Sequence, residues 1–399
     1  MQETDLLIVG AGPVGLSLAL ALADSGLDIT LVDARGAGAA ADDPRTLALS
    51  HGSRLALERL GVWQGLPATP IETIHVSQQG SLGRTLIRAS EEGVPALGHV
   101  VAAGALARAL EQAVRARGIR VLNHRELRHS HEQAVPHGER LSVTLHDTHP
   151  EAPAGENTQG ERFRPRLLAC AEGGLQAGQP DVVEQDYGQH ALIGFIDSPG
   201  ARERIAYERF TAHGPLALLP CGERFALVHV CRPEQADALM ALEAAEYLAR
   251  LQAIIGRRVQ LQGIGERHRY PLLLRYRQHP VGERTVWLGN AAQTLHPVAG
   301  QGFNLALRDV WALTETLLHT HRRPPADPGA PALLASFARQ RQLDRSATIR
   351  FTDGLIRVFS NDIAPLHHLR GAGLFALDLF PPLRSFIARR MMFGARAWP

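Results

Sequence analysis

Lysine is absent from this chain of 399 residues, so all 42 of its basic side chains are arginine. Chemistry that needs a lysine Schiff base, including the attachment of pyridoxal phosphate, is therefore excluded. Cysteine is scarce: Cys170, Cys221 and Cys231 have no metal-ligand spacing and cannot form an even disulfide framework. This composition suits a reducing compartment, and we expect a cytoplasmic protein.

The sequence also lacks a strong net charge and a long apolar run. The formal net charge of +2 gives no electrostatic reason to expect a nucleic-acid partner. No uninterrupted apolar stretch is long enough to span a membrane, and the first residues indicate a strand rather than a secretory signal. With 45% hydrophobic residues, the chain is long enough to bury a large core in two interleaved domains.

Histidine is concentrated between residues 124 and 149. The spacings match no metal-ligand pattern, and the surrounding residues predict loops and a hairpin. We therefore expect solvated surface histidines and no metal site. The residues concerned are His124, His129, His131, His137, His146 and His149.

Three glycines near the N-terminus have the spacing of a dinucleotide-binding turn. Gly10 permits the tight turn, Gly12 allows a pyrophosphate to approach, and Gly15 lets a helix pack closely on a strand. A buried strand over 5–9 precedes them and a helix over 14–25 follows. A second strand over 29–32 ends at Asp33, where an acid can bind ribose hydroxyls. This turn alone does not distinguish NAD from FAD.

A second glycine motif, between Leu288 and Asn304, favours FAD. The residues predict a strand end over 285–288, a loop, and a helix over 304–318. Gly300 and Gly302 let the backbone approach a flat ligand where a Cβ would collide. The helix directs free N–H groups and a partial positive charge at its ligand, which suits a flavin ring that gains negative charge on reduction. An ordinary glycine-rich helix start is the alternative.

The remaining pattern predicts an α/β protein in which strands and helices alternate. Loops are expected over 36–44, 148–165 and 321–331. We expect a helix over 103–117, a strand over 119–122, a hairpin arm over 140–146 with its partner near Phe163, and a buried strand over 167–171.

Between residues 183 and 269 the pattern changes to an antiparallel sheet that forms a wall for substrate. The expected strands are 191–196, 206–210, 217–219 and 225–230, and one helix over 243–255 interrupts them. We therefore expect an FAD-binding domain over 1–75, 98–180 and 270–355. The substrate domain is expected over 76–97 and 181–269, and a helical tail over 356–399.

Together with the first glycine turn, the segment Gly289-Asn290…His296-Pro297…Gly300-Gln301-Gly302-Phe303-Asn304 resembles the class A FAD-dependent aromatic hydroxylases. Within that class the chain resembles the ubiquinone-biosynthesis hydroxylases, and most of all the 2-polyprenyl-6-methoxyphenol hydroxylase branch. The resemblance covers nearly the whole chain, including residues 43–50, 209–217, 352–355 and 359–361. It implies a p-hydroxybenzoate-hydroxylase-like fold: a discontinuous Rossmann-type FAD domain, an inserted antiparallel β-sheet domain and a helical C-terminal tail.

The resemblance also implies roles for single residues. Arg45 is expected near the flavin, Asn290 on a ribityl hydroxyl, and the loop from Pro297 to Asn304 around the ring. Asn290 and Gln293 replace an Asp and a His that are more usual in the class, but the Asn290 amide oxygen still accepts a hydrogen bond. The candidate cofactor-binding residues are Gly10, Gly12, Gly15, Asp33, Arg45, Gly289, Asn290, Pro297, Gly300, Gln301, Gly302 and Asn304.

Two departures from the family pattern concern the reductant more than the flavin. Ala171-Glu172-Gly173-Gly174-Leu175-Gln176 stands where the family has Ala-Asp-Gly followed by Ser-x-x-Arg, and no Arg follows here. The Arg often found where Ala102 or Ala103 stands is also missing.

The implied reaction hydroxylates the ring of a hydrophobic polyprenylated phenol in ubiquinone biosynthesis. NAD(P)H reduces FAD, O₂ adds at flavin C4a, and the hydroperoxide transfers oxygen to the ring. The protein then has to exclude water, position the ring and polarise the phenol. His296, with Pro297, is our candidate catalytic residue because it is the one titratable group in the flavin loop. A histidine that only holds the loop is the alternative, and Arg45 either binds substrate or flavin phosphate or anchors its own loop.

Two other functions stay open on the sequence. A flavin dehydrogenase or reductase on the same fold would need no oxygen pocket. A non-catalytic subunit of the ubiquinone biosynthetic complex is suggested by the altered segment over 172–179. Consumption of O₂ that depends on NAD(P)H and is stimulated by a phenol separates the three.

The C-terminal tail mixes bulky apolar residues with arginine, and Pro381-Pro382 predicts a break between two short helices. A prenylated phenol resides in the membrane, so its enzyme needs a bilayer contact or a partner that presents the lipid. Basic residues beside apolar ones suit either contact, so localisation peripheral to the inner membrane is one expectation. A tail that packs across the protein's own core is the other.

Overall fold

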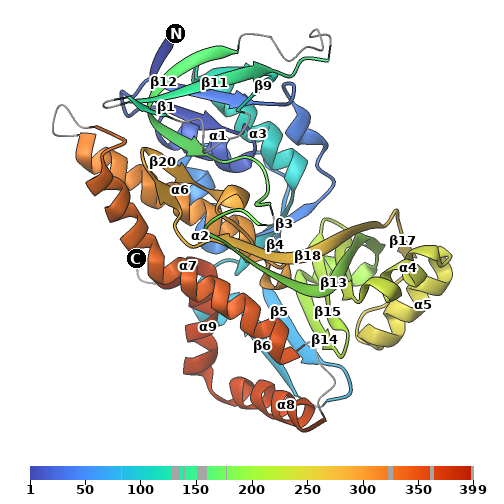
Figure 1. Ribbon diagram of the computed structural model, residues 1–399. Coiled ribbons are helices and arrows are strands. Elements are labelled where there is room, and N and C mark those ends of the chain that lie inside the picture. The colour runs from blue at the N-terminus through green and yellow to red at the C-terminus, as the bar shows by residue number, and fades with distance from the viewer. Residues whose placement is uncertain are drawn as a thin grey trace.

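The computed structural model describes every residue except 82, 128–134, 138–139, 151–159, 177, 322–326, 360–363 and 397–399. Two large sheets organise the described chain, and the first forms the upper half of Figure 1. Its strands have the order β10 (Val135–His137), β11 (Arg140–Asp147), β12 (Glu161–Cys170), β1 (Gln2–Val9), β2 (Ile29–Asp33) and β8 (Arg120–Asn123). β9 (Arg125–Glu126) pairs with β11, β20 (Thr285–Trp287) with β12, and β19 (Val281–Gly282) with β20.

β1 is a central strand of this sheet, because it pairs in parallel with β12 on one side and β2 on the other. Parallel strands in such a position are buried on both faces. Leu6 and Ile8 pack in the core beneath α1 (Pro13–Ala21), α3 (Ala103–Ala116) and α6 (Gln301–His321). The alternate residues Leu7 and Val9 pack in a second core with side chains of β11 and β12. A continuous apolar strand is therefore what this position requires.

The second sheet lies at the lower right of Figure 1. Its order is β21 (Gln293–Thr294), β18 (His268–Arg277), β13 (Val182–Asp197), β16 (Arg224–Cys231), β15 (Gly214–Cys221), β14 (Ile205–Thr211), β5 (Thr73–Gln78) and β6 (Arg84–Arg88), with β17 (Gly263–Ile264) on β13. One face packs under α4 (Pro233–Ala241) and α5 (Ala244–Ile255), where Tyr247 is completely buried. The other face is directed at the loop before α6, because Phe210 packs against Val298.

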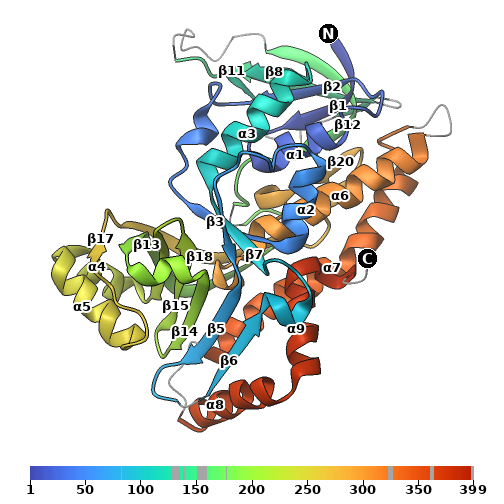
Figure 2. The same cartoon turned by 180° about the vertical axis from the view of Figure 1, so that it is seen from behind.

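A small third sheet connects the two halves, as Figure 2 shows from behind. It contains β3 (Thr46–Ser50), β7 (Gly98–Ala102) and β4 (Ala68–Ile71), and α2 (His51–Arg59) follows β3 directly. The short 3-10 helices are η1 (Ala39–Asp42), η2 (Ala89–Glu92), η3 (Pro199–Glu203), η4 (Gly289–Ala291), η5 (Val298–Gly300) and η6 (Gly394–Arg396).

Three helices complete the chain: α7 (Pro331–Phe359), α8 (Ala364–Leu379) and α9 (Pro381–Phe393). α8 lies along the edge strand β6 at the bottom of Figures 1 and 2, and the Leu86 backbone N–H donates to Asp378 at 3.2 Å. α9 ends on α2, where the ring centroids of Phe393 and His51 are 5.8 Å apart. Among the helices of the described chain, none combines the length and the apolar character that crossing a membrane demands.

Several predicted elements are confirmed, and two interpretations are wrong. The hairpin arm is confirmed, with Val143 opposite Phe163, and so is the helix break at Pro381. The predicted loop over 148–165 is wrong at its end, because β12 begins at Glu161 and pairs with both β11 and β1. The single helix over 243–255 is also incomplete: α4 precedes it, beginning at Pro233 in the position that proline favours.

The division into domains remains our proposal. Strand pairing places β5, from Thr73, and β18, to Arg277, in the second sheet. We therefore propose that the substrate domain extends a few residues beyond the expected boundaries at 75 and 270.

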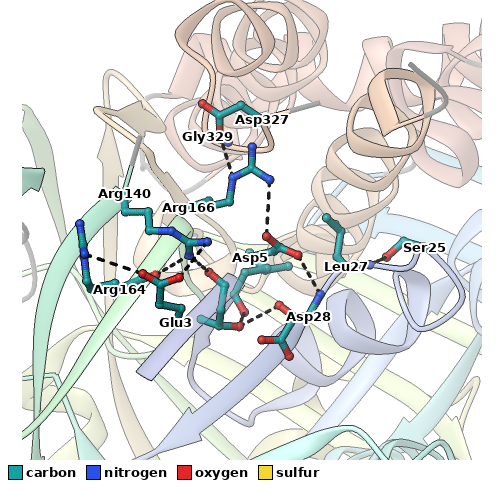
Figure 3. A network of polar contacts seen from close by, with 12 residues as sticks. Glu3, Asp5, Ser25, Leu27, Asp28, Arg140, Arg164, Arg166, Asp327 and Gly329 are labelled. Carbon is teal, nitrogen blue, oxygen red and sulfur yellow. Dashed lines mark hydrogen bonds and ion pairs between the residues drawn. The ribbon is translucent and has the colours of Figure 1, made fainter. Parts of the chain in front are cut away.

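Ion pairs gather at the amino-terminal end of β1, as Figure 3 shows. Glu3 lies 3.7 Å from Arg164, Asp5 lies 3.5 Å from Arg166, and Arg166 lies 3.7 Å from Asp327. Each partly exposed pair contributes little alone, but together they join β1, β12 and the segment before α7. The carboxyl ends of the same strands stay free for glycine-rich loops, which is where ligands bind in such sheets.

Candidate functional site

The three N-terminal glycines have different surroundings. Gly10 has a φ of +105°, and a Cβ there would lie 2.5 Å from the Glu172 Cβ. A Cβ on Gly15 would lie 1.9 Å from the Gly10 carbonyl oxygen, whereas one on Gly12 would meet no atom within 4 Å. Gly10 and Gly15 are thus required by the protein's own packing, while Gly12 borders open space. That space adjoins the free N–H groups at the start of α1, where a pyrophosphate fits.

The Asp33 carboxylate closes the end of β2 beside this turn. It is only 4% exposed, accepts the Ala11 N–H at 2.7 Å and pairs with the Arg35 guanidinium at 3.0 Å. Burial alone would raise its pKa, but the hydrogen bonds and charge of Arg35 outweigh burial and hold the pKa below its usual value. The ionised Asp33 lines a cavity of about 240 Å³ with Arg35 and residues 36–40, which suits a nucleoside.

Glu172 follows β12 and lies against Gly10. Burial, reinforced by the negative charges of Asp33 and Glu126, raises the pKa of this carboxyl to about 7. Arg35 is the cation whose charge counteracts that rise. The departure from the family pattern therefore leaves the space beside Gly12 open. It also places near that space a carboxyl, that of Glu172, whose charge depends on pH.

The second glycine motif repeats this arrangement. Gly289 (φ +57°) turns the chain after β20, and a Cβ there would lie 3.0 Å from the Val14 side chain. Gly300 (φ +58°) turns it again, with a Cβ position 3.0 Å from the Ala48 Cβ. A Cβ on Gly302 would meet nothing within 4 Å. Open space therefore also lies at the N-terminus of α6, where a flat ring fits against the backbone.

The Asn304 side chain holds this loop against β3 and α2. Its Oδ1 accepts the Ser50 N–H at 2.8 Å and the Ser53 hydroxyl at 2.7 Å. Its Nδ2 donates to the carbonyls of Ala48 at 2.9 Å and Gly300 at 2.7 Å. The amide hydrogens are both used, so Asn304 positions the loop rather than offering a donor to a ligand.

His296 is buried in the loop with 1% exposure. Its Nδ1 accepts the Val298 N–H at 3.1 Å, so the neutral ring carries its proton on Nε2, which has no partner among the described residues. The ring stands edge-on to Tyr187 at 5.6 Å. Burial lowers the pKa of His296 to about 3, so it stays neutral under ordinary conditions. The arrangement offers an N–H donor rather than a titrating acid or base.

The remaining candidates lie around the same opening. Pro297 is exposed and begins the η5 turn, and Gln301 is buried at the start of α6. The exposed Arg45 holds both carboxylate oxygens of Asp43, at 2.9 and 2.6 Å. Asn290 is exposed in η4, so its amide faces outward from the end of β20.

A buried polar network behind the loop was not found from the sequence. Gln293 donates to Asp309 at 2.9 Å and accepts from Arg345 at 2.7 Å. Arg341 joins Asp309 at 2.6 Å and Asp344 at 2.7 Å. These contacts fix β21, α6 and α7 relative to one another. Two arginines one helical turn apart on α7 were the available signal, but their partners lie far away in the chain.

The sheet face that packs against the loop is apolar. Val298 of η5 packs with Phe210 of β14 and Ile356 of α7, and Val76 of β5 contacts the same cluster. Phe210 also stacks on Phe359, with ring centroids 4.0 Å apart. A hydrophobic aromatic ring suits such a wall, because few polar groups there would bind water in place of the ring.

Comparison with known proteins agrees with this geometry. The family described as FAD binding domain matches residues 3–352. Ubiquinone hydroxylase UbiL of Rhodospirillum rubrum is 33% identical over 410 residues, covering 100% of this chain and 91% of the relative. The 3-demethoxyubiquinol 3-hydroxylase of Escherichia coli is 29% identical over 389 residues, covering 94% and 95%. The crystal structure of p-nitrophenol 4-monooxygenase PnpA from Pseudomonas putida DLL-E4 has the same fold, with a TM-score of 0.76 at 14% identity over 99% of this chain and 100% of that one.

Proposed function

This chain belongs to the FAD binding domain family, and on that basis we propose that it is an FAD-dependent aromatic monooxygenase of ubiquinone biosynthesis. It hydroxylates the ring of a polyprenylated phenol with O₂ and with NAD(P)H as electron donor. The observation that carries the proposal is the pair Gly12 and Gly302, where missing side chains leave open space at two helix N-termini. The names of the relatives support the substrate class.

The residues present fit FAD. The diphosphate fits beside Gly12 at the start of α1, and a ribose fits on the Asp33 carboxylate. The exposed Asn290 amide suits the ribityl chain, and the flavin ring fits over the loop from Pro297 to Gly302. When bound, FAD supplies the redox chemistry: it takes electrons from NAD(P)H and, with O₂, provides the oxygen atom for the ring.

The protein's own part is positioning and exclusion of water. The wall of Val298, Phe210 and Ile356 keeps the reacting ring in an apolar environment. The neutral His296 presents an N–H donor from inside the loop. Asn304 holds the loop in place through its four hydrogen bonds to β3, α2 and Gly300.

The altered segment after β12 gives no specific support to a non-catalytic subunit. Glu172 lies against Gly10, and a Cβ on Gly12 would still meet no atom within 4 Å. The open space beside Gly12 is therefore compatible with the proposed flavin site.

We further propose that α8 and α9 contact a membrane surface. One face of this tail is buried on the protein, with Leu374, Ala388 and Met392 at 6%, 3% and 4% exposure. The other face leaves large apolar side chains exposed by more than half of their surface: Phe375, Leu379, Phe380, Leu383 and Phe386. Apolar exposure on this scale is typical of a contact surface, and a prenylated substrate resides in the bilayer. The buried face fits the expectation that the tail packs on the protein's own core, and the exposed face fits the expectation that it contacts a membrane.

A purified preparation tests the enzymatic proposal directly. We expect a flavin absorbance spectrum, O₂ consumption that needs NAD(P)H and is stimulated by a prenylated phenol, and a product with one added oxygen. Flavin reduction without oxygen transfer would favour a dehydrogenase or reductase instead. A protein that takes up no FAD would refute the proposal.

A further inference from the structure

Glu208 of β14 lies on the wall that faces the flavin loop. Its register neighbours are Val76 of β5 and Ala217 of β15, and Phe210 lies two residues farther along on the same face. Val76 and Phe210 both pack in the cluster that contains Val298 of the loop. The Glu208 side chain therefore lies on the same face of the sheet as Val76 and Phe210, beside the apolar cluster that contains Val298.

The neighbours of Glu208 confirm which face it occupies. Tyr207 packs in the core under α5, on the opposite side of the sheet. Arg209 donates to the Ser77 hydroxyl at 3.2 Å, also on that side. Because side chains alternate along a strand, Glu208 is directed away from both and toward the loop.

Glu208 makes no hydrogen bond and no ion pair with any residue that the structure describes. Glu208 keeps part of its surface exposed, and desolvation of its carboxyl is the only cause that raises its pKa, to about 7. The titratable or charged groups on the elements around this face include Arg45, Tyr187, Cys221, Tyr270, His296, Asp353 and Arg357, together with Arg370 and Asp378 of α8. Several of these are engaged elsewhere: the Tyr187 hydroxyl donates to Asp353 at 3.0 Å, and Arg357 also pairs with Asp353.

An unpaired carboxyl in an apolar wall costs folding free energy, so its presence calls for a partner that the protein alone does not supply. A phenol is such a partner, because its hydroxyl is a donor and its ring suits the surrounding wall. The position is thus polar at one point and apolar everywhere around it, which matches a hydroxylated ring.

Resting on the proposed function, we propose that Glu208 binds the substrate's phenolic hydroxyl and takes its proton during oxygen transfer. As the new C–O bond forms on the ring, the O–O bond of the activated oxygen breaks and the departing oxygen keeps its electron pair. The phenolic O–H bond breaks at the same time, its electron pair moves into the ring, and the proton passes to the carboxylate. The hydroxylated carbon then loses its own proton to water, the C–H electron pair restores aromaticity, and the carboxyl gives a proton back to the phenolic oxygen. Glu208 thereby selects substrates with a free hydroxyl and fixes the ring position that faces the flavin.

The test compares Glu208→Gln with the wild type, using a soluble short-chain prenyl phenol. Glu208→Gln keeps the shape but not the base, so we expect normal flavin content and kcat lower by roughly 10²-fold or more. The rise of wild-type kcat/KM with pH near 7 should disappear in the variant. Glu208→Asp retains a carboxylate and should keep that rise at a lower rate. Glu203→Gln, an exposed control nearby, should behave as the wild type.

A second measurement uses the methyl ether of the same phenol. The wild type should bind the phenol more tightly than the ether, followed by the change in flavin absorbance, and Glu208→Leu, which has no hydrogen-bond acceptor, should lose that preference. Wild-type kcat and an unchanged pH profile in Glu208→Gln would overturn the assignment while leaving the proposed function intact. A wild type that hydroxylates no phenol would instead overturn the proposed function itself.

Discussion

Gly10 and Glu172 lie back to back at the carboxyl end of the first sheet, because a Cβ on Gly10 would be 2.5 Å from the Cβ of Glu172. A side chain on Gly10 would therefore collide with Glu172. The contact also brings a carboxyl whose pKa is about 7 next to the turn at which we propose that the diphosphate binds.

Replacing Glu172 by Gln should change how stability depends on pH. Its pKa rises from 4.5 to about 7 on folding, chiefly through burial, so ionising it disfavours the folded state. The stability that protonated Glu172 contributes to the folded state is therefore fully present below pH 4.5 and is lost as pH rises through 7. Between pH 5 and 8 we expect the free energy of unfolding to fall by on the order of 1–2 kcal/mol more in the wild type than in the variant, after allowance for solvent screening. Urea unfolding of the flavin-free proteins measures this, and equal losses would contradict it.

Gly12→Val should abolish FAD uptake and leave the fold intact. The φ of −78° and ψ of 177° at Gly12 are allowed for valine, and its Cβ would meet no protein atom within 4 Å. Gly15→Ala is the matched contrast, because its Cβ would lie 1.9 Å from the Gly10 oxygen. We expect Gly15→Ala to lower the melting temperature and Gly12→Val to leave it unchanged. Unaltered flavin affinity in Gly12→Val would remove the diphosphate from this turn.

Gly302→Ala should separate stability from flavin placement in a similar way. Alanine at this helical position is favoured over glycine by about 1 kcal/mol, and its Cβ meets nothing in the protein. The stability of the flavin-free protein should therefore hold or rise, while flavin affinity and hydroxylation fall. Gly300→Ala, with φ +58° and the Ala48 contact, should lose stability as well. Titration with FAD and thermal unfolding distinguish the two variants.

His296→Asn should lower activity without moving its pH profile. The imidazole has a pKa of about 3 because it is buried, so it does not change charge between pH 5 and 9. The variant lacks the imidazole Nδ1 that accepts the Val298 N–H, so the loop should bind flavin less tightly. A limb of the kcat profile that vanishes in this variant would show that His296 does titrate during turnover.

Exposed phenylalanines of the tail should control attachment to vesicles. Replacing Phe375, Phe380 and Phe386 by Ser together removes side chains that are 57%, 63% and 65% exposed, so folding and flavin content should persist. Sedimentation with anionic phospholipid vesicles should fall at least several-fold. Met392→Ser, at a position only 4% exposed, is the structural control and should lower the melting temperature instead. Full vesicle binding by the triple variant would assign the tail to packing alone.

Local patterns predicted the parts of the site that depend on neighbouring residues. The strand, turn and helix around Gly10 follow from a buried apolar run and glycine spacing within a few residues. The break before Pro381 follows from the proline itself. The missed helix α4 has a proline start but a weak apolar periodicity, which a sheet-rich context concealed.

Contacts between distant residues could not be predicted in the same way. Asn304 and Ser53 are separated by 251 positions, and only the folded chain shows that one holds the other. Glu208 is similar: alternation along β14 fixes that it and Phe210 share a face, but not which face turns to the flavin loop. That choice is made by α5, which covers the other side.

The contact between α9 and α2 connects the surface of the molecule to its flavin loop. Phe393 packs against His51, and the Met392 carbonyl oxygen lies against Gly52. These two contacted residues stand between Ser50 and Ser53, which both donate hydrogen bonds to Asn304. A force that shifts α9 reaches the amide of Asn304 through one turn of helix. If engagement of the tail shifts α9 and thereby changes the affinity of the flavin loop for its ligand, occupancy of the loop must change the affinity of the tail by the same factor.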